Sequence, residues 1–159
     1  LLRSYGEVAR YDHRVKGVNS RLDELQAAVL LARLPGVDRG NARRRSIAAA
    51  YRDGLGETGL LDAVHVADDG HVYHLFVVRV GNRDRFREAL RRRGIATLVH
   101  YPTPVPRQPA YAEHALAMRH LPETDRASAE VVSLPMFPEL TGDEVARVIE
   151  ACRDTARDG

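Results

Sequence analysis

The residues best suited to chemistry near the start of the chain lie in segment 15–26, VKGVNSRLDELQ. This segment contains Lys16, the only lysine of the sequence. A lysine that forms a Schiff base needs an amine that is partly deprotonated near neutral pH, which requires burial or neighbouring cations. Lys16 follows Asp12, His13 and Arg14 in a polar, loop-like lead-in, and nothing in that lead-in indicates burial. We therefore expect Lys16 to be a surface residue.

Beside the lysine, Asn19, Ser20 and Arg21 bring hydrogen-bond donors to the expected start of a helix. Ser20, with Asp23 three residues later, forms a weaker version of the capping box, in which side chains satisfy free backbone N–H groups. The same donors, together with the positive end of the helix dipole, can hold a phosphate. The pattern leaves both interpretations open, a capped helix and an anion site.

A second candidate is the segment VHYPTPVPRQPAY, residues 99–111. His100 and Tyr101 end an expected strand and enter a proline-stiffened loop, where side chains can project into a cleft with little freedom to move. A structural turn with a hydrogen-bonded histidine and a packed tyrosine explains the pattern equally well. The residues alone do not choose between a turn and a binding site.

Three further histidines, His65, His71 and His74, do not have the spacing of a standard metal site, so we expect no bound metal. His74 lies in an apolar strand pattern and is interpreted as a hydrogen-bonded core histidine. Arg79, at the end of that pattern, is a weaker candidate for contact with a partner or substrate.

The elements that must position these residues alternate along the chain. A helix through residues 22–32 ends at Pro35 and Gly36, and a second helix through 37–55 ends in the glycine-rich segment 54–59. A covered strand is expected at 71–80, a helix at 83–93, a strand at 95–101, a short strand at 133–137 and a last helix from Thr141 or Gly142. The long connection 102–125 is proline-rich, with one helical turn at 110–118.

The second helix is expected to turn one face inward, and the last two helices do the same. The inward residues are Val37, Ile47, Ala48, Tyr51 and Leu55, then Phe86, Ala89 and Leu90, and finally Val145, Val148, Ile149 and Cys152. The expected fold class is therefore α+β, a small sheet covered by helices.

Composition limits the possible classes of protein. The chain has 159 residues, of which 24 are basic and 22 acidic, for a net charge of +2. Interleaved charges produce no strong field for nucleic acid or an anionic membrane, so we expect neither partner. The single cysteine cannot form an internal disulfide, and no stretch is apolar enough for a signal peptide, so we expect a cytoplasmic protein. Because the chain opens on Leu1 and its first methionine is Met118, we expect an interior cut of a longer polypeptide.

Motifs in a fixed order carry a resemblance over nearly the whole chain. They are GVNSRLDELQAAVLLARL, NARRRSIAAAYRDGL, HLFVVRV followed by RDRFREALRRRGI, VHYPTPVPRQPAY, LPETDRASAEVVSLPMFPELT and EVARVIEA. In this order and spacing the sequence resembles the DegT/DnrJ/EryC1/StrS family of pyridoxal-phosphate-dependent sugar aminotransferases. The resemblance implies the C-terminal part of a fold type I enzyme that aminates a nucleotide-linked keto sugar with an amino acid donor such as glutamate.

The resemblance also implies a division of the chain and a partner. Residues 1–56 would be a helical lead-in with interdomain or dimer helices, and residues 57–159 the C-terminal α+β small domain. The large domain, which binds pyridoxal 5'-phosphate and carries the Schiff-base lysine, would lie upstream of Leu1. The enzyme would be a homodimer with active sites at the interface, in antibiotic or polysaccharide biosynthesis. The chain alone would lack the catalytic residue.

By resemblance, Asn19 reaches the cofactor phosphate of the neighbouring subunit, and Arg21 supports the same region. Arg44 in RRRSIA matches an arginine expected near substrate phosphates, which suits the planar guanidinium fork. His100 and Tyr101 would form the active-site wall near the sugar. Arg43 and Arg45 are interpreted as a solvated helix face. The family often has a histidine at the position of Pro106 and Arg107, so this sequence departs from the pattern there.

Three alternatives stay open. A sugar dehydratase uses the same scaffold with the lysine replaced, and the deciding residue would lie upstream. The second is a non-catalytic dimerisation or binding module. The third is a nucleic-acid binder, favoured by the arginine runs 43–45 and 91–93 but opposed by nearby acids and the lack of interleaved aromatic residues.

Overall fold

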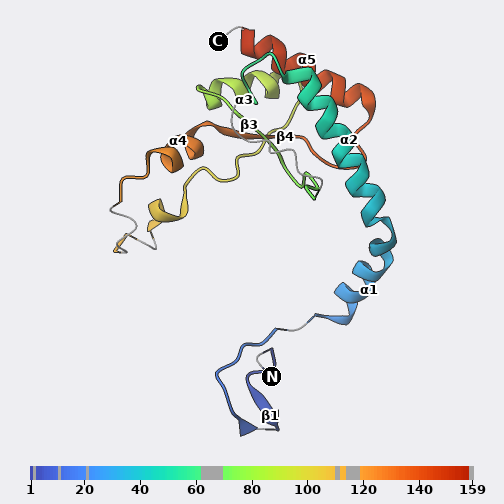
Figure 1. Ribbon diagram of the computed structural model, residues 1–159, viewed down its shortest axis with the longest axis vertical. Helices are drawn as coiled ribbons and strands as arrows, with labels where there is room; N and C mark the ends of the chain where they lie inside the picture. Colours follow the sequence, from blue (N-terminus) through green and yellow to red (C-terminus); the bar gives the residue numbers. More distant parts are fainter. Residues whose placement is uncertain are drawn as a thin grey trace. The chain divides into compact units, whose positions relative to one another are not determined.

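The computed structural model describes residues 1, 3–10, 12–20, 22–61, 70–109, 112–113 and 119–157. Contacts along the chain group it into two compact units, Leu1–Asp38 and Arg39–Gly159. Figure 1 shows the whole chain, coloured from the N-terminus in blue to the C-terminus in red. Within the described ranges, no helix combines the length and the apolar character needed to cross a lipid bilayer.

The first unit begins with a small antiparallel pair, β1 (Glu7–Ala9) and β2 (Asp12–His13). An isolated bridge then joins Ser4 to Asn19, and the backbone N–H of Ser20 donates to the carbonyl of Arg3 at 3.0 Å. Residues 19 and 20 are therefore extended chain, hydrogen-bonded to the segment around residue 4. This pairing excludes them from a helix start.

Helix α1 (Glu24–Arg33) begins four residues after Ser20, with Asp23 as the N-cap and no side-chain capping bond. The prediction of Ser20 as the cap is wrong, because its backbone is already committed to the bridge with the 3–4 segment. Asp23 and Glu24 place acidic groups at the start of the helix, where they complement its dipole. Those carboxylates also disfavour a phosphate there, so the helix-start version of the anion site is not supported.

A 3-10 turn, η1 (Leu34–Gly36), joins α1 to α2 (Val37–Leu55), as Pro35 and Gly36 predict. Helix α2 buries Ile47, Ala48, Tyr51 and Leu55, which confirms four of the five predicted inward residues. Val37 is 46% exposed and does not belong to that face. None of the ten residues of α1, all of them described, is buried.

The second unit is built on an antiparallel pair, β3 (Phe76–Arg79) and β4 (Val131–Leu134). The register pairs Phe76 with Leu134 and Val78 with Val132, and all four side chains are buried. Leu98 adds a single bridge to Ser133 on β4. In Figure 1, α3 and α5 lie above β3 and β4 and α2 runs alongside, and buried residues of all three helices pack with the two strands in one core. The predicted small sheet covered by helices is therefore present.

The strands predicted at 71–80 and 95–101 are both longer than the strands in the structure. Residues 71–75 are not strand, because Tyr73 adopts a positive φ of 50° and its backbone N–H bonds to Nδ1 of His71 at 3.0 Å. His74 is exposed, so it is not the core histidine expected. In the segment 95–101, only Leu98 pairs with β4.

Three helices complete the unit: α3 (Arg83–Arg92), α4 (Pro122–Glu130) and α5 (Gly142–Arg157). Helix α4 was not predicted, because its sequence has no apolar face and none of its residues is buried. Thr141 and Glu144 form a full capping box at α5, with backbone bonds of 2.8 and 3.2 Å. Of the turn predicted at 110–118, residues 110, 111 and 114–118 lie outside the described residues.

The core lies between the sheet and the helices. Phe86 and Leu90 of α3 and Val145, Val148 and Cys152 of α5 are buried, as predicted, whereas Ala89 and Ile149 are half-buried. A methyl group added to Gly54 of α2 would approach Ile149 to 2.6 Å, so the two helices cross closely there. Burial raises the pKa of the Cys152 thiol to about 12, which keeps it protonated and unreactive.

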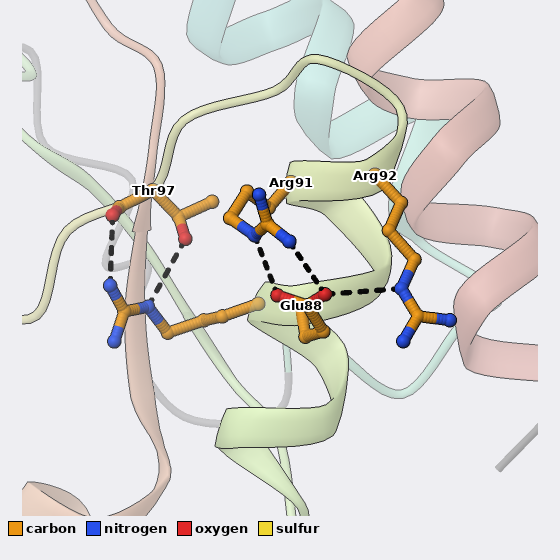
Figure 2. Close-up of polar contacts among 5 residues, drawn as sticks. Glu88, Arg91, Arg92 and Thr97 are labelled. Atoms are coloured by element: carbon orange, nitrogen blue, oxygen red, sulfur yellow. Dashed lines mark hydrogen bonds and ion pairs between the residues drawn. The ribbon is translucent and has the colours of Figure 1, made fainter.

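Figure 2 shows an exposed charge cluster at the end of α3, where Glu88 accepts from both Arg91 and Arg92. These hydrogen bonds, the bond from Arg91 first, lower the pKa of Glu88 from 4.5 to about 2. The folded state therefore gains stability from Glu88 above the unfolded pKa, and loses that gain as the pH falls from about 4.5 towards 2. Solvent screening keeps the contribution small.

A pH titration of the side-chain carboxyl carbons by NMR is expected to give Glu88 a pKa near 2. The variant Arg91→Ala removes the larger of the two interactions and is expected to move the value up towards 4.5. A wild-type pKa close to 4.5 would contradict the cluster as described.

Candidate functional site

Helix α3 and strand β4 hold the segment that leads to His100 from two sides. On one side, Arg87 of α3 donates to the hydroxyl and to the carbonyl of Thr97, each at 3.2 Å, and Figure 2 shows Thr97 receiving both bonds. On the other side, Leu98 exchanges two backbone hydrogen bonds with Ser133 of β4, at 2.8 and 3.2 Å. The chain is therefore fixed two residues before His100.

The imidazole of His100 is itself tied to β4. Its Nδ1 lies 2.8 Å from Oγ of Ser133, whose residue is only 4% exposed. The ring of Tyr101 packs against the His100 ring edge-on, with centroids 5.5 Å apart and an interplanar angle of 86°. Tyr101 is 71% exposed. The structure thus brings the two predicted residues together, with the histidine anchored and the tyrosine open to solvent.

His100 lines two cavities. The first, of about 530 Å³, is mostly apolar and includes Leu98, Met136 and Phe137, with Glu144 and Arg147 of α5 as its charged groups. The second, of about 490 Å³, lies between the proline-rich loop and α4 and includes Tyr101 and Ser128. Apolar walls with a few placed polar groups are typical of small-molecule sites. His100 is the titratable side chain that both cavities share.

An ion pair holds the proline-rich loop beside the second cavity. Arg107, in the 3-10 turn η2 (Val105–Arg107), donates from Nε and Nη2 to the two carboxylate oxygens of Asp125 on α4, at 2.9 and 2.7 Å. The guanidinium bonds hold the pKa of Asp125 below its usual range. The residue at which this sequence departs from the family pattern therefore fastens the loop to α4.

Arg44 lies on α2 and is half-buried. Its Nη1 donates to Oδ1 of Asn41 at 3.2 Å, and its Nε is buried without a hydrogen-bond partner among the described residues. The structure does not place Arg44 at either of the cavities that His100 lines. An unpaired buried guanidinium nitrogen is nevertheless a donor that an anion can satisfy.

The neighbouring arginines are not simply a solvated face. Arg43 is half-buried and donates to the carbonyl of Leu140 at 2.6 Å, so it links α2 to the loop before α5 and corrects the prediction. Arg45 is exposed, as expected, and donates to the carbonyl of His71 at 3.2 Å. Arg79 donates from Nε to the carboxylate of Glu130 at the end of α4, at 3.0 Å. This ion pair neutralises the guanidinium within the chain, so no partner or substrate is needed to explain it.

Asn19 belongs to the first unit and is exposed. Its side-chain amide has no hydrogen-bond partner within the part of the chain that the structure describes. Lys16 is exposed, as predicted. Arg21 lies outside the described residues, so its predicted role beside Asn19 stays a prediction.

Ser133 and Arg87 were not singled out from the sequence. The one signal for Ser133 was a polar residue within the apolar run VVSL, and in the described structure it is the only polar residue that is buried. Arg87 had no signal, because its role depends on Thr97 lying opposite α3. Both residues act by holding the segment that carries His100. Among the described residues, no group of three or more His, Cys, Asp or Glu side chains forms a metal cluster, and His65 lies outside them.

The DegT/DnrJ/EryC1/StrS aminotransferase family matches residues 1–153. The chain belongs to this family. It is 46% identical, over 98% of its length, to a dTDP-3-amino-3,4,6-trideoxy-α-D-glucose transaminase of Streptomyces venezuelae. It is 45% identical, over 95% of its length, to a dTDP-3-amino-3,6-dideoxy-α-D-galactopyranose transaminase of Aneurinibacillus thermoaerophilus. The chain spans 41% of the length of each of these DegT/DnrJ/EryC1/StrS relatives.

A solved structure has the same fold. The crystal structure of S. venezuelae DesV in complex with a ketimine intermediate superposes with a TM-score of 0.89 at 46% identity, covering 98% of this chain and 42% of that one. The predicted fold class, an α+β domain of the type found in these aminotransferases, is confirmed.

Proposed function

We propose that the chain is the C-terminal part of a pyridoxal-phosphate-dependent enzyme that transfers an amino group from an amino acid such as glutamate to a nucleotide-linked keto sugar. The observation that carries this proposal is the identity of 46% over 98% of the chain to a dTDP-amino-sugar transaminase. The proposed setting is antibiotic or polysaccharide biosynthesis in the cytoplasm.

The division of the chain into a lead-in of residues 1–56 and a small domain of residues 57–159 is part of the proposal. The cofactor-binding large domain would precede both. Apolar side chains on α1 and at the start of η1 support an interdomain or dimer role, because Leu25, Leu31 and Leu34 are each more than 60% exposed and available for a partner surface. The expected partner is a second subunit of the same protein.

The described residues fit the phosphate end of pyridoxal 5'-phosphate and not its reactive end. The exposed amide of Asn19, on extended chain outside the helix start, can donate a hydrogen bond to a phosphate of the neighbouring subunit's cofactor. Lys16 is exposed on the lead-in, whereas a Schiff-base lysine needs burial or neighbouring cations. The lysine would therefore come from the upstream domain. When bound, the cofactor supplies the electron sink of the reaction.

His100 and Tyr101 are the proposed sugar-binding wall, because they lie on an anchored segment beside two cavities of substrate size. Arg44 is proposed for substrate phosphates, since its buried Nε lacks a partner in the described structure. The roles of these side chains are to bind and orient the sugar and to exclude water from the reacting carbon.

The test is an amino-transfer assay with the longer protein that contains this segment. With ¹⁵N-labelled glutamate and a dTDP-linked 3-keto sugar, mass spectrometry is expected to show the label in the sugar product. Loss of a sugar hydroxyl without incorporation of the label would instead favour the dehydratase of the same scaffold. Absence of both products, over a range of nucleotide-linked keto sugars, would contradict the proposed function.

A further inference from the structure

We infer that Ser133 is the positioning residue of His100, and that it fixes the imidazole in the tautomer whose Nε2–H donates to an oxygen of the sugar substrate. The sugar as ligand rests on the proposed function. The tautomer itself rests on the structure alone.

Ser133 is buried in the sheet and lines the first cavity together with His100. The residue lies on β4 between β3 and the bridge to Leu98, and it is 4% exposed. Its backbone N–H and carbonyl are both engaged by Leu98. Burying a hydroxyl without a hydrogen bond costs about 1–3 kcal/mol, so the proton of this hydroxyl needs an acceptor.

The acceptor is Nδ1 of His100, at 2.8 Å from Oγ. Within the described residues, the side chain of Ser133 forms its hydrogen bond with this ring nitrogen. If Nδ1 carried the proton instead, it would donate to Oγ, and the hydroxyl proton would have no acceptor among the described protein groups. A neutral imidazole that accepts at Nδ1 carries its proton on Nε2. The serine therefore selects the Nε2–H tautomer.

That tautomer determines what His100 can recognise. Nε2–H is a donor, so it is complementary to hydroxyl, carbonyl and phosphate oxygens and not to an N–H group. The bridge at Leu98 holds the backbone two residues before His100, and the bond to Ser133 holds the ring itself, so both are in place before a ligand arrives. Such anchoring lowers the entropy that binding removes.

The test is ¹⁵N NMR of the histidine rings of this chain, at a pH where the neutral imidazole predominates. The His100 signals are assigned by their loss in His100→Gln. In the wild type we expect the shifts of the Nε2–H tautomer. Ser133→Ala is expected to shift the pair of resonances towards a mixture of tautomers, and Ser133→Thr, which restores a hydroxyl, to reverse the shift.

A matched control is Ser128→Ala. Ser128 lines the second cavity with His100, but its hydroxyl donates to the carbonyl of Asp125 at 2.9 Å. This variant is expected to leave the His100 resonances unchanged. A wild-type Nδ1–H tautomer, or a tautomer unaffected by Ser133→Ala in a variant with a wild-type circular dichroism spectrum, would overturn the inference.

In the longer protein, Ser133→Ala is expected to raise KM for the nucleotide sugar about two- to tenfold, with the larger effect on KM than on kcat and with rescue by Ser133→Thr. An unchanged KM would overturn the role in sugar binding. If the protein shows no amino transfer while the NMR result holds, the proposed function fails and the serine–histidine pairing stands.

Discussion

Replacing Phe76 with alanine is expected to lower the free energy of unfolding of the Arg39–Gly159 unit by about 3–5 kcal/mol. Phe76 is fully buried on β3, its ring lies 4.9 Å from the ring of Tyr51, and it is paired with Leu134 of β4. Truncation removes apolar contacts from the core. It also leaves a cavity, because the close-packed helix α2 and the sheet can relax only partly into the space. Urea denaturation followed by circular dichroism measures the loss.

Phe137→Ala is the matched control. Phe137 is 45% exposed and lines the first cavity, so the same chemical change is expected to cost at most about 1.5 kcal/mol. Equal losses for the two variants would contradict the assignment of the core to the space between the sheet and the helices. The comparison also separates core packing from a general effect of removing an aromatic ring.

The helices were predictable because their apolar residues recur at the helical period. Tyr51 and Leu55 on α2, Phe86 and Leu90 on α3, and Cys152 on α5 are all buried as expected. Helix α1 also follows that period, yet its apolar residues are exposed in this chain. Periodicity therefore predicted the helix correctly and could not say what covers it.

The strands were less predictable, because an apolar run does not show where pairing stops. The run 71–80 is interrupted by the left-handed backbone at Tyr73, and the run 95–101 pairs only at Leu98. Helix α4 could not be predicted either, because none of its residues is buried and its sequence has no apolar face. These features depend on neighbours distant in the sequence, which local patterns do not contain.

The candidate site also has a part that could be predicted from the sequence and a part that could not. The loop with His100 and Tyr101 could be selected from its prolines and its place after an apolar run. The hydrogen bond from Ser133 could not, because 33 residues separate it from His100 and only the antiparallel bridge brings them together. Resemblance supplied the roles of Asn19, Arg21 and Arg44, and these roles stay predictions.

The second large effect is expected for Asn19→Asp in the longer protein with its cofactor bound. The change keeps the shape of the side chain, removes the amide donor and adds a negative charge beside the proposed phosphate. A hydrogen bond to a charged group contributes about 1.5–3 kcal/mol, so the affinity for pyridoxal 5'-phosphate is expected to fall roughly ten- to hundredfold. Equilibrium dialysis or the cofactor's absorbance measures the change.

Ser20→Ala is the control for this variant. Ser20 is exposed, and its contact with the preceding segment is made by the backbone N–H to the carbonyl of Arg3, which alanine retains. Its affinity for the cofactor is expected to equal that of the wild type. A normal affinity for Asn19→Asp would remove Asn19 from the cofactor site.

The central claim is that this segment completes the active site of a neighbouring subunit. The most direct test mixes two forms of the longer protein after dissociation and reassembly, one with its Schiff-base lysine replaced and one with Asn19→Asp. The assay uses a cofactor concentration at which the Asn19→Asp form alone stays largely unloaded and inactive. If Asn19 serves the partner's site, each hybrid dimer holds one intact site, and the mixture recovers about a quarter of the wild-type amino-transfer rate. A mixture no more active than its two parents would contradict the claim.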